Sequence, residues 1–554
     1  MAKDYSRMNQ EELIETIKKL ESRKKYGLVW DEERTKEVFE VESQNALPVL
    51  KEVKGKEIKT DPEKPTNILI EGDNYHALSV LNFTHQGKID VIYIDPPYNT
   101  GAKDWKYNND YVDENDAYRH SKWLSMMYKR LLLAKRLIKE NGVLIVTIDD
   151  HELFGLLGLL ENLSVKTLGR VSICIKPEGR RQSKYIMEAH EYAIFVTWGN
   201  PEMRGIFTDF GLDFPETDTI SKFRWEGLMR RDAGREDRGS AYWYQFYVSP
   251  EGEISTEKKG DFIEVWPINT KGIERVWLWD KERAANNLGD LRAVVRSGKA
   301  TIYYKRREQG RVKPTSFWYG SKYNANAYGT RVVSSILPEN NFDYPKSVYS
   351  VLDCIDLFLP EKGTVLDFFA GSGTTGHATM LLNENDKGKR TFILCTNNEN
   401  NICSEVTYPR VTRVIKGYKN GSLSVDGLGG NLKYFKTAFV KKSVSKDELK
   451  IRITQKCTEM LCLREGIFEE KETTKSFRIF EQSGRAMAVY YALDRSGLVS
   501  LKKKLDTMES EKTLYCFTLD PLGLDDADFS DWHGVSLEPI PQKILDAYNQ
   551  IYDY

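Results

Sequence analysis

Short, uninterrupted apolar runs recur along this chain, and each ends in turn-forming residues. Residues 67–71 (NILIE), 88–94 (KIDVIYI) and 143–149 (VLIVTID) are such runs, and segments with helical spacing at 74–83 and 123–139 separate them. A strand that is apolar on both sides belongs in a sheet whose two faces are covered, and alternation with helices favours parallel strands. The sequence therefore predicts an α/β fold with a doubly wound, mostly parallel sheet.

The alternation stops after a further apolar strand at 192–198 and returns at 363–369 (GTVLDFF). The residues between are rich in Arg, Gly, Trp and Tyr and have few helical periods, which favours a mostly-β insertion. We expect five segments: an N-terminal helical or extended segment at 1–60, one half of the sheet domain at 61–200, the insertion at 201–330, the other half at 331–428 and a C-terminal α+β domain at 429–554.

Composition narrows the class of protein. The chain has 554 residues, of which 40% are hydrophobic and 29% are charged, so it can bury a sizeable core. Its seven cysteines form no C-x-x-C pair and no Cys/His set at metal spacing, which favours reduced thiols and no metal site. The amino terminus is polar and no apolar run reaches membrane-spanning length, so we expect a cytoplasmic protein without a membrane partner.

The motif Asp95-Pro96-Pro97-Tyr98 directly follows one of the predicted strands. Carboxyl ends of parallel strands are where such folds place their active sites. Asp95 and the Pro96 carbonyl can accept both hydrogens of an amino group, and Tyr98 can stack on the ring that carries it. Those hydrogen bonds would favour a tetrahedral nitrogen with an available lone pair. The plainer interpretation is a strand followed by a proline turn that Asp95 caps.

A second motif lies between a predicted strand and a helix at 367–375 (DFFAGSGTT). Glycines there let a ligand approach the backbone, and the helix amino terminus presents free N–H groups. The motif lacks the lysine of a phosphate-gripping loop, which argues against an NTPase and favours an uncharged adenosine-type ligand with an amino acid tail. The candidate contacts are Asp367, Phe369, Ala370, Gly371, Ser372, Gly373, Thr374 and Thr375.

Together the two motifs resemble the amino-methyltransferases of DNA, and their order, with D-P-P-Y first, is similar to the β class. The chain most resembles the modification subunits of type III restriction–modification systems, over about residues 25–550. That resemblance is carried by GKIDVIYIDPPYNTG, HEYAIFV, the Trp/Arg-rich insertion and NNENNICSEVTYPRVTRVIKGY. It implies S-adenosylmethionine as cofactor and transfer to adenine N6, because cytosine-N4 enzymes more often carry Ser in place of the Asp.

The resemblance also assigns further residues to the cofactor pocket. Asp73 would lie near the cofactor adenine, and the F-x-x-P-K segment Phe342, Pro345 and Lys346 would line the pocket. Within the stretch 396–399, Glu399 or a neighbouring amide would contact the ribose. The family more often has an acid at the immediate strand end, where this chain has Thr396 and Asn397.

Double-stranded DNA is the expected partner, with the target base flipped out of the duplex onto Tyr98. The candidate DNA-binding residues are Arg224, Arg230, Arg231, Arg235 and Arg238 of the insertion and Arg180 and Arg181 of the basic loop 176–184. Trp225, Tyr242, Trp243 and Tyr244 are flat side chains suited to stacking. An ordinary charged surface is the alternative, since Asp232, Glu236 and Asp237 interleave with the arginines.

Other functions remain open on sequence alone. They are cytosine-N4 methylation, a catalytically idle DNA-recognition subunit, and methylation of RNA or a small molecule. The chain has no nuclease or helicase signature, so the resemblance implies a separate restriction (nuclease/helicase) subunit as a possible partner, and a homodimer. The C-terminal domain would serve dimerisation or partner docking.

Overall fold

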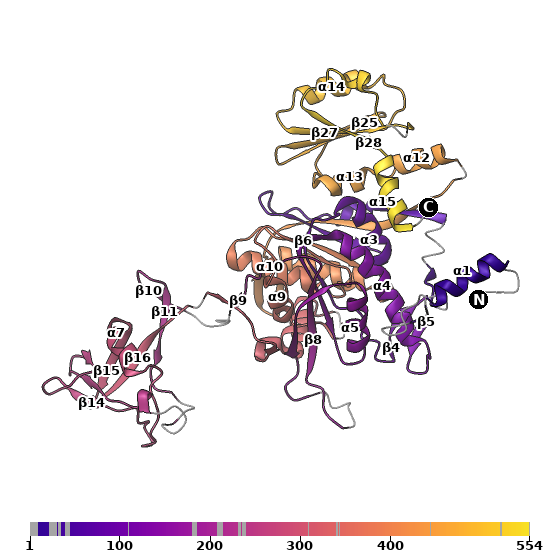
Figure 1. Ribbon diagram of the computed structural model, residues 1–554. Coiled ribbons are helices and arrows are strands. Elements are labelled where there is room, and N and C mark those ends of the chain that lie inside the picture. Colours follow the sequence, from indigo (N-terminus) through magenta and orange to yellow (C-terminus); the bar gives the residue numbers. More distant parts are fainter. Residues whose placement is uncertain are drawn as a thin grey trace. The chain divides into compact units, whose positions relative to one another are not determined.

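The computed structural model describes residues 9–21, 30–31, 35–38, 45–108, 110–179, 185–207, 214–230, 234, 240–308, 310–339, 342, 344–443, 445–520 and 523–552. They belong to two compact units, Met1–Gly205 with Pro314–Tyr554 and Ile206–Lys313 (Figure 1). Each unit has its own hydrophobic core. No helix among these residues is long and apolar enough to cross a membrane.

A ten-stranded sheet forms the centre of the larger unit. Its order is β1 (Ala46–Glu52), β23 (Asn431–Lys441), β2 (Thr66–Glu71), β20 (Thr391–Thr396), β19 (Thr364–Asp367), β3 (Ile89–Ile94), β6 (Ile138–Ile148), β8 (His190–Thr197), β7 (Lys166–Cys174) and β18 (Phe317–Trp318). Only β1 and β8 run antiparallel to their neighbours. The predicted doubly wound, mostly parallel α/β sheet is confirmed.

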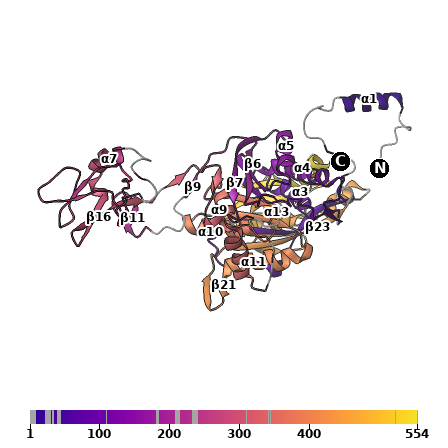
Figure 2. The ribbon, with the colours of Figure 1, turned by 90° about the horizontal axis from the view of Figure 1, so that it is seen from below.

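Helices cover both faces of this sheet, which explains why its central strands are apolar on both sides. Figure 2 shows α3 (Asn74–Thr84), α4 (Arg119–Leu137) and α5 (Leu153–Asn162) on one face and α9 (Val348–Asp356), α10 (Thr374–Asp386) and α11 (Tyr408–Lys416) on the other. All six residues of β3 are buried, and α4 buries Trp123, Met127 and Leu131 against the sheet. The remaining elements of the larger unit outside its C-terminal part are α1 (Gln10–Glu21), β4 (Ala102–Tyr107), β5 (Asp110–Asp113), α8 (Arg331–Ile336), β21 (Gly417–Asn420) and β22 (Leu423–Asp426).

Three strands of the sheet, β1, β18 and β23, come from segments that the sequence assigned to other domains. β1 lies within the expected segment 1–60, and β23 within the expected domain 429–554. The NLKYFKTAFVK sequence of β23 contains three lysines and a threonine among its apolar residues and so lacks the continuous apolar run of a central strand. Its polar side is satisfied locally, because Lys433 pairs with Glu52 at 2.6 Å and Glu57 at 2.7 Å. The sheet domain therefore extends beyond both predicted boundaries.

The C-terminal part of the chain packs directly on the sheet domain. It contains a sheet of β24 (Glu470–Thr473), β25 (Phe477–Gln482), β26 (Arg485–Tyr490), β27 (Glu511–Phe517) and β28 (Val535–Ile540) with α12 (Lys446–Thr454), α13 (Thr458–Glu465), α14 (Leu498–Asp506) and α15 (Gln542–Tyr552). α13 and α15 contact α3, and the Tyr548 hydroxyl donates to the Pro48 carbonyl of β1. Ile544 and Tyr548 belong to the main core cluster, so this part is one compact unit with the sheet.

The smaller unit is mostly β. It contains an antiparallel sheet of β10 (Glu216–Thr217), β11 (Lys222–Gly227), β16 (Lys299–Arg307) and β15 (Leu291–Arg296), a second of β13 (Ile254–Ser255), β12 (Phe246–Val248) and β14 (Ile263–Val265), and α7 (Lys281–Asn286). Phe246, Trp277 and Ile302 lie in its core. β9 (Ile206–Phe207) pairs with β17 (Arg311–Val312) at its two ends. The unit ends before the expected boundary at 330, because β18 pairs with β7 of the larger unit.

Candidate active site

The two sequence motifs meet at one edge of the larger sheet. β19 and β3 are adjacent and parallel, and the chain leaves them in opposite directions, from β19 to β20 through α10 and from β3 to β6 through α4. Ligands of doubly wound sheets bind outside the carboxyl ends of strands at such a switch point. Asp367 is the last residue of β19, and Asp95 directly follows β3. The fold therefore brings both motifs to its expected binding site.

The backbone of the D-P-P-Y motif is held by neighbouring side chains. Thr147 of β6 donates to Asp95 Oδ1 at 2.7 Å, and Trp123 Nε1 of α4 donates to the Pro97 carbonyl at 2.7 Å. No described residue donates to the Pro96 carbonyl. Asp95 and Pro96 thus offer two neighbouring acceptors in a fixed turn, one of them open.

Lys346 lies against this motif. Its ammonium nitrogen is 3.2 Å from Asp95 Oδ1 and 2.5 Å from Glu191 Oε2, and it contacts the Tyr98 hydroxyl. Burial acts to lower the pKa of Lys346, but the charges of Asp95 and Glu191 outweigh it and raise that pKa. Burial, with the same two carboxylates, raises the pKa of the Tyr98 hydroxyl. Lys346 is therefore a cation held at the predicted catalytic residues, and its predicted role toward a cofactor stays a prediction.

Glu191 was missed by sequence reasoning. It is the second residue of β8, and its side chain is only 2% exposed. The Tyr98 hydroxyl donates to its Oε2 at 3.2 Å. The available signal was a charged residue at the start of the buried strand HEYAIFVT, since an acidic residue is seldom buried without a partner.

The Gly-rich motif forms a tight turn from β19 into α10. Gly371 and Gly373 have φ of +48° and +79°, a region that side chains disfavour, and a Cβ added to Gly371 would meet no other atom closer than 3.8 Å. Asp367 accepts from the Phe369 N–H at 2.9 Å and from the Thr375 hydroxyl at 2.6 Å. The turn thus leaves open space beside a buried carboxylate. Of the other predicted contacts, Ala370, Ser372 and Thr374 are buried and Phe369 is half-buried.

Burial shapes the electrostatics of this turn. It raises the pKa of Asp367 to about 7, although the Thr375 hydrogen bond opposes the shift. Arg410 of α11 is fully buried and donates to the Ser372 hydroxyl at 2.8 Å and the Thr374 hydroxyl at 2.9 Å. Burial lowers the pKa of this guanidinium to about 9. Arg410 could not be identified from the sequence, because only the fold brings α11 to the loop.

Asp73 lies at the same edge, where β2 ends and α3 begins. It caps α3 by accepting from the Tyr75 N–H at 2.8 Å, and its side chain is 41% exposed. Arg130 of α4 lies 3.5 Å from Asp73 and pairs with Glu37 at 2.9 Å. Asn74 donates to the Phe368 carbonyl at 2.9 Å, which ties this corner to the Gly-rich motif. Arg130 and Glu37 were not identified from the sequence.

The other predicted cofactor residues differ in their surroundings. Glu399 forms an ion pair with Lys106 of β4 at 2.5 Å. Pro345 is buried beside Lys346, and Phe342 is half-buried with no described contact to the Gly-rich turn. The structure therefore groups Asp73, Asp95, Lys346 and Asp367 most clearly.

Few of the candidate DNA-binding residues are described. Arg231, Arg235, Arg238, Arg180 and Arg181 lie outside the described residues. Arg224 pairs with Glu226 at 3.3 Å, and Arg230 forms no ion pair with any described residue. Trp225 donates to Glu216 at 3.1 Å and carries Arg292 over its ring at 4.7 Å. Tyr244 is a core residue with 6% exposure, so the interpretation of its ring as a stacking surface is wrong.

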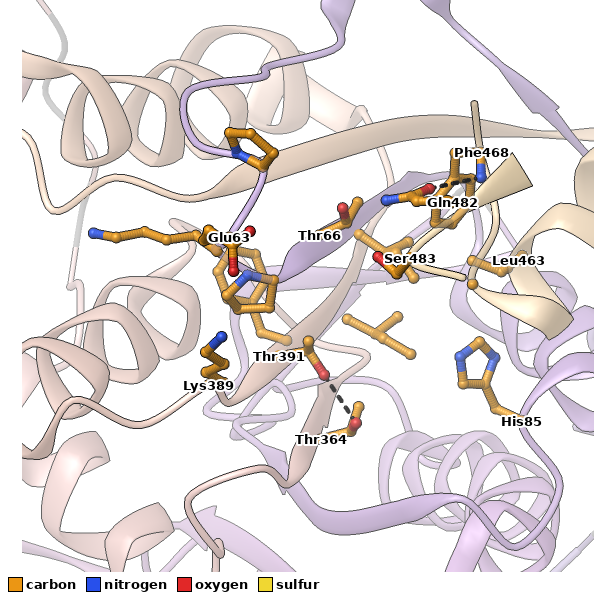
Figure 3. Close-up of a pocket in the computed structure, with 17 residues that line it drawn as sticks. Glu63, Thr66, His85, Thr364, Lys389, Thr391, Leu463, Phe468, Gln482 and Ser483 are labelled. Carbon is orange, nitrogen blue, oxygen red and sulfur yellow. Dashed lines mark hydrogen bonds between the residues drawn. The ribbon is translucent and has the colours of Figure 1, made fainter. Parts of the chain in front are cut away.

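An open cleft of about 350 Å³ lies at the opposite, amino edge of the sheet (Figure 3). Thr66, Thr364 and Thr391, the first residues of β2, β19 and β20, line one side of it. Leu463 and Gln482 of the C-terminal part line the other. None of the candidate site residues lies in this cleft, which separates it from the carboxyl-edge site.

Comparisons with known proteins match the chain to a family. Residues 89–407 match the family model N6_N4_Mtase, described as DNA methylase. The chain is 32% identical over 336 residues to the type II methyltransferase M.KpnI of Klebsiella pneumoniae, which covers 59% of this chain and 79% of that protein. It is 29% identical over 441 residues to the EcoPI Mod subunit of the type III restriction-modification enzyme of Escherichia phage P1, covering 70% and 67%.

Proposed function

Because the chain belongs to the DNA methylase family that matches residues 89–407, we propose that it methylates the exocyclic N6 amino group of adenine within a short DNA sequence. One observation carries the choice of an amino group. Asp95 and the Pro96 carbonyl are adjacent hydrogen-bond acceptors at the switch point of the sheet, as two N–H groups require.

S-adenosylmethionine supplies an electrophilic methyl group on a sulfonium. The residues of the Gly-rich turn fit such a molecule, because Gly371 leaves open space and Asp367 offers a carboxylate. Asp367 and the N–H groups at the start of α10 would hold its amino acid part. Asp73 would accept from its adenosine part, as the resemblance implies, and Glu399 would contact the ribose.

Asp95 and the Pro96 carbonyl act on the amino nitrogen. They accept its two hydrogens and favour a tetrahedral geometry, so that the lone pair is available to attack the methyl carbon. With the cofactor bound, an N–C bond would form as the C–S bond breaks, and Asp95 would take one proton from the nitrogen and pass it to water. Tyr98 stacks on the base, which must leave the duplex at a cost of a few kcal/mol.

Recognition of the DNA sequence is assigned to the smaller unit. Arg224, Arg230, Arg292 and Arg306 of this unit are half-exposed or more and can contact phosphates or base edges. The basic loop 176–184 follows β7, whose carboxyl end lies at the same edge as Asp95. This loop would contact the backbone near the flipped base, and Arg180 and Arg181 remain its predicted contacts.

We further propose that the protein acts as the modification subunit of a type III-like restriction system. Three relatives are named Mod subunits of type III enzymes, from Escherichia phage P1, Salmonella typhimurium and Escherichia coli. A homodimer and a separate nuclease subunit follow from that assignment. The C-terminal part, from α12 onward, would carry one of these contacts.

The experiment that tests the reaction is expression in a host without other DNA methylation, followed by sequencing that detects modified bases. N6-methyladenine at one recurring short motif is the expected result. N4-methylcytosine would overturn the adenine assignment and keep the methyltransferase. An unmodified genome together with absent S-adenosylmethionine binding would point to an idle recognition subunit.

A further inference from the structure

Four side chains from three segments of the chain meet in one cluster, in which Glu191 is buried and the other three are partly buried. Lys346, just before α9, contacts Asp95, Tyr98 and Glu191. The exposed fraction is 14% for the Lys346 side chain and 2% for that of Glu191. The inference below rests on the proposed function, because it concerns how the target base reaches Asp95.

The Lys346 ammonium occupies a position beside Asp95 that the amino group of the target base needs. It lies 3.2 Å from Asp95 Oδ1 and contacts the Tyr98 hydroxyl at the edge of the ring, 4.5 Å from the ring centroid. An amino group that donates its hydrogens to Asp95 must approach the same carboxylate. The ammonium therefore has to move away from Asp95.

Glu191 provides the place to which it can move. Its Oε2 already binds the ammonium at 2.5 Å, while its Oε1 is buried and has no hydrogen-bond partner among the described residues. A buried carboxylate oxygen without a partner is unfavourable, so a second donor there is a gain. A lysine ammonium on its flexible stem can pivot between the two oxygens without leaving Glu191.

We propose that Lys346 caps the base pocket in the DNA-free enzyme and shifts from Asp95 to Oε1 of Glu191 when the target base enters. Glu191 is then a positioning residue that acts through Lys346. The shift leaves a carboxylate free to accept the amino group and keeps the cation close to it. Without Glu191 as a second acceptor, the ammonium stays on Asp95 and competes with the base.

The test compares Glu191→Gln, Lys346→Met and the double variant. Transfer of tritiated methyl groups from S-adenosylmethionine to unmethylated genomic DNA gives kcat/KM, and calorimetry gives cofactor affinity. Glu191→Gln removes one charge-assisted contact and should lower kcat/KM for DNA about 10- to 100-fold, with cofactor affinity unchanged. The double variant, which also lacks the ammonium, should have a kcat/KM about threefold or more above that of Glu191→Gln, because nothing then competes for Asp95.

A matched control is available on α9. Asp353 is another buried carboxylate paired with a lysine, Lys322, at 2.6 Å, and it touches neither Asp95 nor Lys346. Asp353→Asn should lower the melting temperature without lowering kcat/KM. Loss of kcat/KM in Glu191→Gln beyond that in Asp353→Asn, at comparable melting temperatures, supports the positioning role.

Two results would overturn the inference. One is Glu191→Gln with wild-type kcat/KM, and the other is a double variant no more active than Glu191→Gln. Should the double variant fail to fold, Glu191→Asp replaces it, since a shorter carboxylate that still accepts the ammonium should give intermediate activity. Product nucleosides are identified in parallel. N4-methylcytosine from the wild-type protein would overturn the adenine assignment, whereas the order of kcat/KM among the variants separately tests the shift of Lys346.

Discussion

β3 has an aspartate near each of its ends, and each aspartate pairs with a lysine. At the amino edge, Asp90 accepts from Lys139 at 2.7 Å through Oδ1 and from the Thr364 N–H at 2.8 Å through Oδ2. At the carboxyl edge, Thr147 and Lys346 both contact Oδ1 of Asp95, and Lys346 is shared with Glu191 and Tyr98. At the amino edge each oxygen of Asp90 has its own donor, so this pair only stabilises the fold. At the carboxyl edge Asp95 shares its lysine with Glu191, so this carboxylate can exchange the lysine for a substrate.

The largest difference is expected from Asp95→Ala. It removes an acceptor that acts on the transition state, so methyl transfer should fall about 10³-fold. Cofactor affinity should stay within about twofold, because Asp95 does not belong to the Gly-rich turn. Tritium transfer and calorimetry measure the two quantities. Near-normal turnover would show that methyl transfer does not depend on Asp95, and the proposed difference between the two ends of β3 would be wrong.

Asp90→Ala is the counterpart on the same strand. It leaves the Thr364 N–H without its acceptor and Lys139 without its counter-ion, and hydrogen bonds to charged groups each contribute about 1.5–3 kcal/mol. We expect the free energy of unfolding, measured with urea, to fall by about 2 kcal/mol. Activity per folded molecule should be unchanged. A selective loss of activity without loss of stability would contradict the structural role of the amino edge.

Asp367 lies at the same carboxyl edge of the sheet, in the Gly-rich turn. Burial raises its pKa to about 7, so the folded state binds this proton more tightly than the unfolded state does. The resulting contribution to stability is fully present below about pH 4 and is lost as the pH rises through 7. The carboxylate that would bind an ammonium group forms over the same interval. Affinity for S-adenosylmethionine should therefore rise about eightfold between pH 6 and 7.5, as the ionised fraction of Asp367 does, and Asp367→Asn should bind more weakly and flatten this rise. Calorimetry at several pH values measures it, and an equal slope in both proteins would refute the role.

The smallest effect is expected from Lys139→Gln. Lys139 is 39% exposed, and exposed ion pairs contribute little because water and salt screen them. The glutamine keeps a donor for Asp90, so the free energy of unfolding should fall by less than about 1 kcal/mol and kcat/KM should not change. Urea unfolding at low and high salt checks this. A loss above 2 kcal/mol would mean that the charge itself holds the amino edge together.

Local motifs carried most of what the sequence predicted. The apolar runs that became β2, β3 and β19 indicated the doubly wound sheet, and the residues at or just after their carboxyl ends included Asp95 and Asp367. Each of these signals lies within about ten consecutive residues. β23, whose sequence mixes polar and apolar residues, has no continuous apolar run and was placed in the wrong segment.

Contacts between distant segments were not predictable in the same way. Lys346 was assigned to the cofactor pocket, yet its ammonium lies on Asp95, and Glu191 and Arg410 were not singled out. These side chains come from β8, from α11 and from the turn before α9, which adjoin the motifs only after folding. A single sequence does not show which distant residues become neighbours after folding. Buried polar partners such as these therefore cannot be predicted from it.

The first and last segments of the smaller unit, β9 and β17, pair with each other as antiparallel strands, so this neck holds the two ends of the unit together. A segment whose ends are already together can be exchanged for another of different length without stretching the strands around it. Under the proposed division of labour, gene recombination at this neck can give a lineage a new recognition sequence in one event. The chemistry at Asp95 is then inherited intact, and descendants diverge in what they mark and not in how they mark it.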